Sequence, residues 1–98
     1  WVDTPYSFET VDDFSCAQNR GDPSNTLFLV NHWLSNPFSS PENGDQANTA
    51  EQLQARAEQC VAEWGRPINF FGVDFYDRGA LFAVVDGLNG VASDDGTR

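Results

Sequence analysis

The chain has 98 residues, and its 15 acidic against 5 basic side chains give a formal net charge of −10. This length corresponds to one small domain or to a piece of a larger one. Apolar residues make up 40% and aromatic residues 13% of the chain, which excludes the composition of a disordered protein. The negative charge argues against nucleic-acid binding, because that binding depends on Lys and Arg side chains that neutralise phosphate. We expect a folded chain without a nucleic-acid partner.

The residue types add two expectations. The sequence has no Met, which predicts that the chain was processed or cut from a longer protein. Its apolar runs, such as 27–30, are far shorter than the roughly 20 residues that a transmembrane helix needs. We therefore expect no transmembrane segment, and no signal peptide is visible in the sequence.

The two cysteines, Cys16 and Cys60, lie far apart in the sequence and match no close-spaced metal-ligand pattern such as C-x-x-C. One alternative is a disulfide, since an even number of cysteines fits an oxidising compartment. The other alternative is a pair of buried free thiols. Two cysteines alone do not decide between them.

The first part of the chain predicts one strand between irregular segments. Residues 1–26 combine scattered aromatic residues with Asp, Ser, Pro and Gly and predict no regular core element. The apolar run at 27–30, within the segment 26–33, predicts a strand that is buried on both faces and becomes polar at its end. Residues 34–46 predict a long loop, which in a compact domain is often functional.

A helix is predicted over residues 49–64. Its apolar residues recur at three- and four-residue steps and form one stripe. Asn48 or Thr49 is expected to cap its N-terminus, because an acidic or amide side chain follows three residues later. Gly65 is expected to end it.

A second strand and a last helix complete the pattern. Residues 68–75 are mostly apolar and show little alternation between apolar and polar side chains, which predicts a strand buried on both faces. The helix is expected over 80–88, where Asn and Gly follow the last apolar residue. Residues 93–98 are polar and predict a flexible tail.

This element order predicts the fold class. Consecutive strands that are joined through a helix run parallel, and strands that are apolar on both faces need cover on both sides. The chain is therefore expected to be α/β, as the C-terminal βαβα fragment of a (β/α) TIM-like barrel with parallel strands. Residues 1–98 would form a single partial domain, because two strands alone leave their outer edges open. The alternative is an independent α/β domain that closes its sheet by oligomerisation.

Both predicted strands end in polar residues, at the place where parallel α/β folds bind their ligands. His32 and Trp33 end the first strand. His32 is either a ligand or proton-transfer group, or a neutral histidine that orients the loop. Trp33 either stacks on a sugar-like ring or belongs to the core. These alternatives stay open at the level of sequence.

The second strand ends in Asp74, Tyr76, Asp77 and Arg78. Because side chains alternate along a strand, Asp74 and Tyr76 are expected to point to one side, into the mouth of the barrel. Asp77 and Arg78 form either a turn-and-cap pair at the last helix or part of the site. In the site, the Arg78 guanidinium would grip a phosphate group.

Other catalytic motifs are absent from the sequence. It contains no nucleophile elbow G-x-S-x-G, no P-loop and no G-x-G-x-x-G. Its loop carboxylates have no EF-hand spacing and predict a solvated acidic surface instead of a metal site. No cofactor is expected, and a divalent metal stays an open alternative.

Three stretches carry a resemblance to a known family, namely FETVDDFSCAQNRG at 8–21, LFLVNHWLSNP at 27–37 and the segment from NTAEQLQ to GLNG at 48–90. They resemble the C-terminal part of secreted PLC-like phosphodiesterases, the superfamily of phosphatidylinositol-specific phospholipase C X domains. The resemblance covers about residues 1–91, and NHW and VDFYDRG are its most specific parts. It implies a distorted (β/α) barrel, with 27–31 and 68–75 as its last two strands.

The resemblance also implies a chemistry. In the family, two histidines of the N-terminal half act as general base and general acid, so that the inositol 2-hydroxyl attacks the phosphorus and diacylglycerol leaves. Neither histidine is in this chain, and His32 on the penultimate strand is not one of them. Asp74 is implied as the carboxylate that orients a catalytic histidine. The substrate-binding residues expected around it are His32, Trp33, Tyr76 and Arg78.

These observations predict part of a secreted or extracellular phosphodiesterase that is inactive alone. Its substrate would be a phosphodiester or a phospholipid headgroup, and its partner would be the missing N-terminal part of the barrel. The alternative is a non-catalytic module that binds a carbohydrate or a protein through Trp33, Tyr76 and the loop 34–46. Two histidines at strand ends in an upstream sequence would favour the enzyme.

Overall fold

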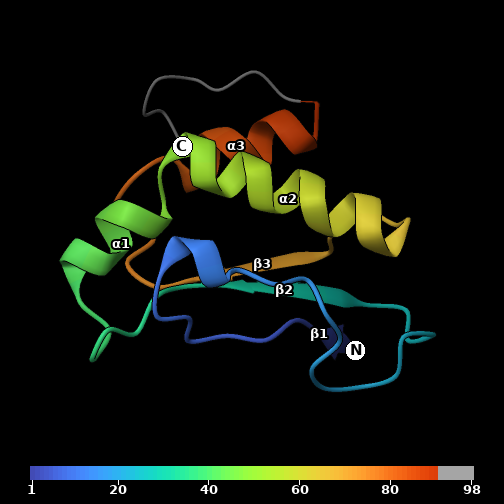
Figure 1. Ribbon diagram of the computed structural model, residues 1–98. Helices are drawn as coiled ribbons and strands as arrows, with labels where there is room; N and C mark the ends of the chain where they lie inside the picture. The colour runs from blue at the N-terminus through green and yellow to red at the C-terminus, as the bar shows by residue number, and fades with distance from the viewer. Residues whose placement is uncertain (91–98) are drawn as a thin grey trace.

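The computed structural model describes residues 1–90, which form three strands, three α-helices and a short 3-10 helix (Figure 1). In chain order the elements are β1 (Val2–Asp3), η1 (Val11–Asp13), β2 (Phe28–His32), α1 (Pro41–Ala47), α2 (Ala50–Trp64), β3 (Phe70–Val73) and α3 (Leu81–Leu88). The predicted tail, residues 93–98, lies outside the described residues.

The strands form one open sheet in the order β1–β2–β3, and both strand pairs are parallel. β2 lies in the centre, where Val2 is opposite Phe28 on one side and Phe70 is opposite Leu29 on the other. A further bridge between Phe8 and Leu34 continues the pairing beyond β1. The prediction of an α/β chain with parallel strands is confirmed.

The helices α2 and α3 cover one face of this sheet, and no helix of residues 1–90 covers the other (Figure 1). Phe28 and Val30 of β2 point to the covered face, where they form a buried core with Val2 and both cysteines. The ring of Phe28 lies 4.6 Å from that of Trp64 on α2. We call the other face the open face.

The helix α2 confirms the prediction over residues 49–64. The Thr49 hydroxyl caps it by accepting a hydrogen bond of 3.2 Å from the Gln52 N–H. Its buried stripe includes Leu53, Ala57 and Cys60. Gly65 ends it in a left-handed conformation with φ of 65°, which glycine adopts without steric strain. Capping and periodicity therefore define this helix locally.

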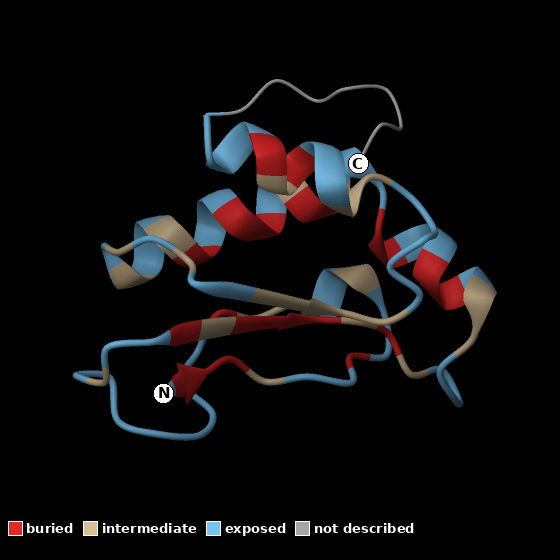
Figure 2. Ribbon diagram, turned by 180° about the vertical axis from the view of Figure 1, so that it is seen from behind, coloured by how far each residue is buried: buried red, intermediate tan, exposed pale blue. Residues whose placement is uncertain are grey.

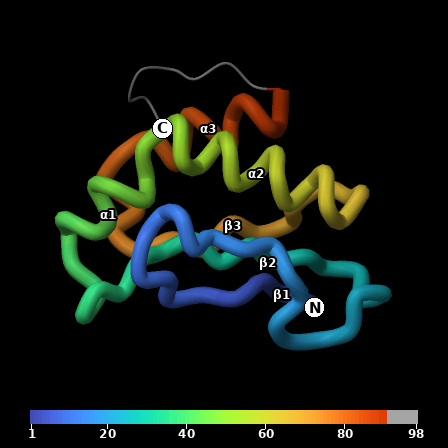
Figure 3. Tube along the Cα trace, viewed as in Figure 1, coloured from blue at the N-terminus to red at the C-terminus, as the bar shows by residue number. Residues whose placement is uncertain are grey.

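Two segments that the sequence predicts as irregular contain regular structure. Within residues 1–26, β1 pairs with β2, and η1 lies on the covered side, as the Cα trace shows (Figure 3). Within the predicted loop 34–46, the chain forms α1. The Ser40 hydroxyl caps α1 by accepting the Asn43 N–H, and Pro41 occupies its first position. Proline is favoured there because its fixed φ suits the helix and its missing N–H is not needed.

The strand β3 is shorter and less buried than the prediction over residues 68–75. None of its four residues is fully buried, and the Phe70 side chain is 54% exposed. Figure 2 shows this difference between β3 and the mostly buried β2. Because β3 is an outer strand with helices on one face only, the prediction of burial on both faces is wrong for residues 1–90.

Candidate functional site

The open face carries a polar cluster across β1 and β2, where Asp3 is opposite Leu29. Asn31 faces this side, since its Oδ1 atom lies beside Gly72 of β3, on the side away from Phe28 and Val30. Its Nδ2 donates a hydrogen bond of 3.0 Å to the buried carboxylate of Asp3. Arg20, from the segment between η1 and β2, donates to the same carboxylate through Nε over 2.9 Å.

Hydrogen bonds decide the ionisation of this cluster. Burial would raise the pKa of the Asp3 carboxyl, but hydrogen bonds from Arg20 and Asn31 outweigh burial and hold this pKa below its ordinary value. In return, the hydrogen bond to Asp3 raises the pKa of Arg20. Both groups are therefore ionised at neutral pH. Because the Asp3 carboxylate is fully engaged, it orients Arg20 and does not serve as a free base.

A row of rings lies beside the ion pair. The guanidinium carbon of Arg20 is 5.1 Å from the ring centroids of both Trp1 and Tyr6. Tyr6 stacks in turn on Trp33, with a centroid separation of 5.5 Å. The indole N–H of Trp33 donates to the Ser7 hydroxyl over 3.1 Å. We call Trp1, Arg20, Tyr6 and Trp33 the open-face stack, and its exposed rings can stack on a sugar-like ring.

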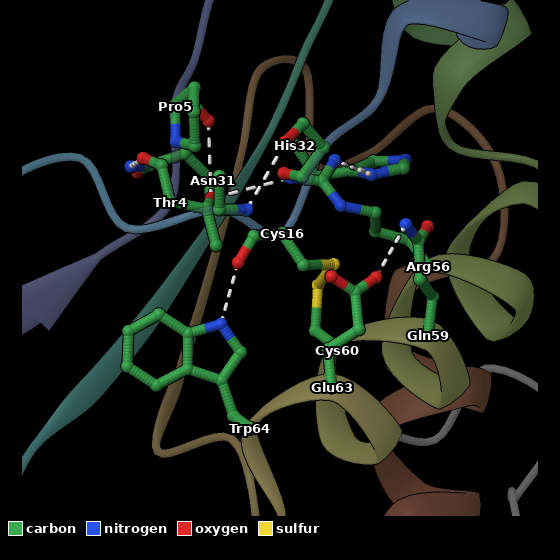
Figure 4. The surroundings of a disulfide bond; sticks show 12 residues. Thr4, Pro5, Cys16, Asn31, His32, Arg56, Gln59, Cys60, Glu63 and Trp64 are labelled. Carbon is green, nitrogen blue, oxygen red and sulfur yellow. Dashed lines mark hydrogen bonds between the residues drawn. A yellow bond between two sulfur atoms is a disulfide. The ribbon is translucent and has the colours of Figure 1, made fainter. Parts of the chain in front are cut away.

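His32 lies on the opposite, covered side and is fully buried (Figure 4). Its Nε2 is 2.7 Å from the carbonyl oxygen of Ala47, which can only accept, so Nε2 carries the proton. Nδ1 therefore accepts from the Arg56 guanidinium, at 3.4 Å. The imidazole also stacks on Phe14, with centroids 4.2 Å apart. His32 thus matches the predicted alternative of a neutral histidine that orients neighbouring segments.

Burial lowers the pKa of His32 to about 4, and the nearby Arg56 charge contributes in the same direction. Between about pH 6.5 and 4, the unfolded chain binds a proton at this residue that the folded chain does not bind. The free energy of unfolding should therefore fall by up to about 3 kcal/mol as the pH decreases through this range. Urea denaturation at pH 7.5 and 4.5 measures the loss.

The matched control for this prediction is His32→Gln, whose amide retains a donor for the Ala47 carbonyl but does not titrate. The acidic side chains titrate in both proteins, so the difference between them isolates His32. An equal loss of stability in both proteins would contradict the assignment of His32 as a buried neutral group.

Arg56 is a buried cation on the covered side, and within residues 1–90 it has no carboxylate partner. Its Nη2 donates to the Ser15 carbonyl over 2.6 Å and to the Thr4 hydroxyl over 3.3 Å. The rings of Phe8 and Phe14 lie 5.0 and 4.9 Å from its guanidinium carbon. Burial lowers the pKa of Arg56 to about 10, against the opposing effect of the Glu63 charge. Arg56 therefore stays protonated at neutral pH.

A disulfide between Cys16 and Cys60 ties the segment after η1 to α2, with a Cα–Cα distance of 5.2 Å (Figure 4). Beside it, the indole N–H of Trp64 donates to the Cys16 carbonyl over 2.6 Å. Of the two alternatives that the sequence leaves open, the structure contains the disulfide. This bond and Arg56 hold the same segment on the helices.

Asp74 directly follows β3, at the C-terminal end of the sheet, and is half-buried. Its carboxylate makes no hydrogen bond or ion pair within residues 1–90. The predicted alternation of Asp74 and Tyr76 does not hold, because the chain leaves the sheet after Val73 and Phe75 has a φ of 51°. Tyr76 is 62% exposed and contacts the Phe82 ring of α3, with centroids 6.0 Å apart.

Arg78 forms an ion pair of 2.9 Å with Asp45 of α1, and both side chains are about half exposed. Asp77 is exposed and does not cap α3, whose N-cap Ala80 has no side-chain hydrogen bond. The predicted site residues are therefore distributed over three places. His32 lies among the helices, Trp33 belongs to the open-face stack, and the others lie in the loop after β3.

The structure adds Asp3, Arg20 and Asn31, which form a polar cluster on the open face, to the residues predicted from the sequence. The placement of Asn31 could have been predicted from the sequence. Side chains alternate along a strand, so Phe28 and His32 share one face of the sheet and Asn31 lies on the other. Asp3 and Arg20 belong to the segment that predicts no regular element. Their pairing depends on contacts between distant parts of the chain, and no local pattern indicates it.

Other features bear less on function. A hollow of about 460 Å³ between α2 and α3, lined by Val61, Ile68 and Leu88 among others, lies at the N-terminal end of β3 and so opposite to the usual ligand end. Among residues 1–90 no group of three or more His, Cys, Asp or Glu side chains could hold a metal ion. The helices within these residues lack the length and hydrophobicity that a bilayer-spanning segment requires.

Comparisons with family models, with curated proteins and with solved structures find no match for this chain.

Proposed function

We propose that the chain is part of a phosphoric diester hydrolase or lyase of the phosphatidylinositol phospholipase C-like type. The observation that carries this proposal is the asymmetry of the sheet. Helices cover one face, the other carries Asp3, Arg20 and Asn31, and Trp33 and Asp74 directly follow the carboxyl ends of the parallel strands β2 and β3. In a (β/α) barrel the helices lie outside, and the substrate binds at the carboxyl ends of the strands. This arrangement supports a C-terminal βαβα part of such a barrel.

The outer edge of β3 also supports a larger sheet. The Thr4 N–H donates to the Leu29 carbonyl over 3.2 Å, so the backbone groups of Leu29 point to β1 and those of Phe28 and Val30 point to β3. In the parallel register of β2 and β3, Phe70 and Gly72 then face β2, and the outward backbone groups of β3 are those of Phe71 and Val73. These groups have no hydrogen-bond partner within residues 1–90. A further strand would pair with them and cover the exposed Phe70. We propose that the missing N-terminal part of the barrel supplies it.

In the proposed reaction a general base removes the proton of the inositol 2-hydroxyl, and its oxygen attacks the phosphorus. The bond to the diacylglycerol oxygen breaks, and a general acid protonates that oxygen. The missing part of the barrel would supply both histidines. Asp74 would orient one of them by accepting its N–H, and Trp33, Tyr76 and Arg78 would contact the substrate. His32 has no part in this chemistry, because both of its ring nitrogens are engaged in the core.

The replacement Asp74→Asn tests this proposal in a longer protein that contains the histidine pair. Turnover of phosphatidylinositol vesicles should fall about 100-fold or more, because an amide does not stabilise the protonated histidine as a carboxylate does. The exposed neighbour provides the control Asp77→Asn, which removes the same charge and should retain activity. Unchanged turnover with Asp74→Asn would remove Asp74 from the mechanism.

The chain of 98 residues alone should show no turnover above background, since it lacks the acid and the base. Turnover by this chain would contradict the proposal that the rest of the barrel supplies them.

The second candidate is a non-catalytic module that binds a carbohydrate or a protein. It is favoured by the open-face stack, whose Trp1 ring is 57% exposed and whose Tyr6 and Trp33 rings are stacked. An upstream sequence without histidines at its strand ends would favour this module. Tyr76 would then act separately, because its ring contact is with Phe82 and not with the stack.

We also propose that the protein is secreted or extracellular. The Cys16–Cys60 disulfide supports this localisation, because structural disulfides form and persist mainly in oxidising compartments.

A further inference from the structure

The loop after β3, which carries Asp74, lies against the corner between α1 and α2. Asn48 occupies this corner and is fully buried. Its Nδ2 donates to the Asp74 carbonyl over 2.8 Å and to the Phe75 carbonyl over 3.1 Å. Its own carbonyl accepts the Ala80 N–H over 2.9 Å. One residue thus binds both ends of the loop 74–80.

Two glycines allow this close approach. Gly79 has a φ of 93°, and a Cβ atom added there would lie 2.1 Å from the Asn48 carbonyl oxygen. On α1, a Cβ atom added to Gly44 would lie 3.0 Å from the Cβ of Phe75. The loop backbone therefore lies in direct contact with the backbone of the α1–α2 corner. A side chain larger than glycine at position 79 would force the loop and the corner apart.

We propose that Asn48 is the positioning residue for Asp74. Its side-chain amide holds the backbone carbonyls of Asp74 and of the next residue, so it fixes the peptide plane on each side of Phe75 and limits the directions open to the Asp74 carboxylate. This positioning of Asp74 by Asn48 does not depend on any reaction, whereas its effect on turnover rests on the proposed function.

Asn48 constrains the loop more than its ion pair does. The Arg78–Asp45 pair is exposed on both sides, and exposed ion pairs contribute little to structure. Asn48 itself is fully buried and its hydrogen bonds to the loop are partly buried, so losing its donor leaves carbonyl groups with little compensation from water. The Asn48 Oδ1 atom has no partner within residues 1–90, so the donor side of the amide provides the contact.

The test compares Asn48→Asp with Asn43→Asp. Both replacements are isosteric and remove a buried amide donor, but the Asn43 amide of α1 donates to the Phe38 carbonyl and not to the loop. In Asn48→Asp, the amide protons of Arg78 and Ala80 should exchange about tenfold faster, and the carboxyl ¹³C signal of Asp74 should shift or split. Backbone exchange in the β2–β3 ladder should change less than exchange in the loop.

Asn43→Asp should leave the Asp74 signal and the exchange of Arg78 and Ala80 as in the original chain. Equal effects of both replacements on Asp74, or no effect of Asn48→Asp on it, would overturn the proposal. A measurement on the unchanged chain remains decisive if Asn48→Asp does not fold. There the Nδ2 protons of Asn48 should be protected from exchange, and free exchange would overturn the proposal.

A kinetic readout separates this inference from the proposed function. In the longer protein, Asn48→Asp should lower kcat for phosphatidylinositol about tenfold or more with a smaller change in KM, because the misplaced group acts on a catalytic histidine. An altered Asp74 signal together with unchanged kcat would refute a catalytic role of Asp74 and leave the positioning by Asn48 intact.

Discussion

Replacement of Cys16 and Cys60 by alanine should lower the free energy of unfolding by about 4 kcal/mol. The two residues are 44 positions apart, and the disulfide therefore closes a long loop that includes β2 and α1. Its loss increases the conformational entropy of the unfolded chain. Since small domains have a total stability of about 5–15 kcal/mol, the double variant should be close to unfolding. Urea denaturation of both proteins measures the difference.

Reduction of the original chain is the control for packing. Both sulfur atoms are buried, so alanine also removes some apolar contacts, whereas the reduced thiols retain them. Reduction should lower the stability nearly as much as the alanine pair. If only the alanine pair were destabilised, packing and not the covalent link would be responsible.

The replacement Arg56→Ala should lower the free energy of unfolding by about 3 kcal/mol or more. It leaves the Ser15 carbonyl and the His32 Nδ1 without their donor. It also creates a cavity between the rings of Phe8 and Phe14. Calorimetry at neutral pH checks the loss, which should also appear as faster exchange of amides near Ser15.

Arg56→Met separates cavity formation from charge. Methionine fills most of the same space and removes a guanidinium that is buried without a carboxylate partner within residues 1–90. Replacing a buried charge by an apolar side chain of similar volume is often nearly neutral. We therefore expect a loss about half that of alanine or less. An equal loss in both variants would show that the hydrogen bonds, and not the packing, dominate.

The predictions from sequence succeeded where the interactions are local. The helix over 49–64 follows from its cap, its stripe and Gly65, all of which act within a few residues. The strand around 27–30 follows from a continuous apolar run. The helix α1 has a usable local signal in Ser40 followed by Pro41, but its polar and glycine-containing sequence resembles a loop.

The predictions failed where distant residues decide. Two residues form β1, and only their pairing with Phe28 and Leu29 makes them a strand. The same long-range pairing brings Arg20 to Asp3, so this part of the candidate site was not visible in the sequence. The alternation rule failed after Val73, because Asn48 and Gly79 direct the chain away from the sheet.

The positions of the three tryptophans make the chain's own fluorescence informative. Trp64 donates its indole N–H to the Cys16 carbonyl, next to a disulfide, and disulfides quench nearby indoles. Trp1 and Trp33 belong to the open-face stack on the other side of the sheet. Reduction should therefore brighten the emission of Trp64, whereas a ligand on the open face should change that of Trp1 and Trp33. The change on reduction thus reports on the covered face of the sheet, and the change on ligand addition reports on the open face.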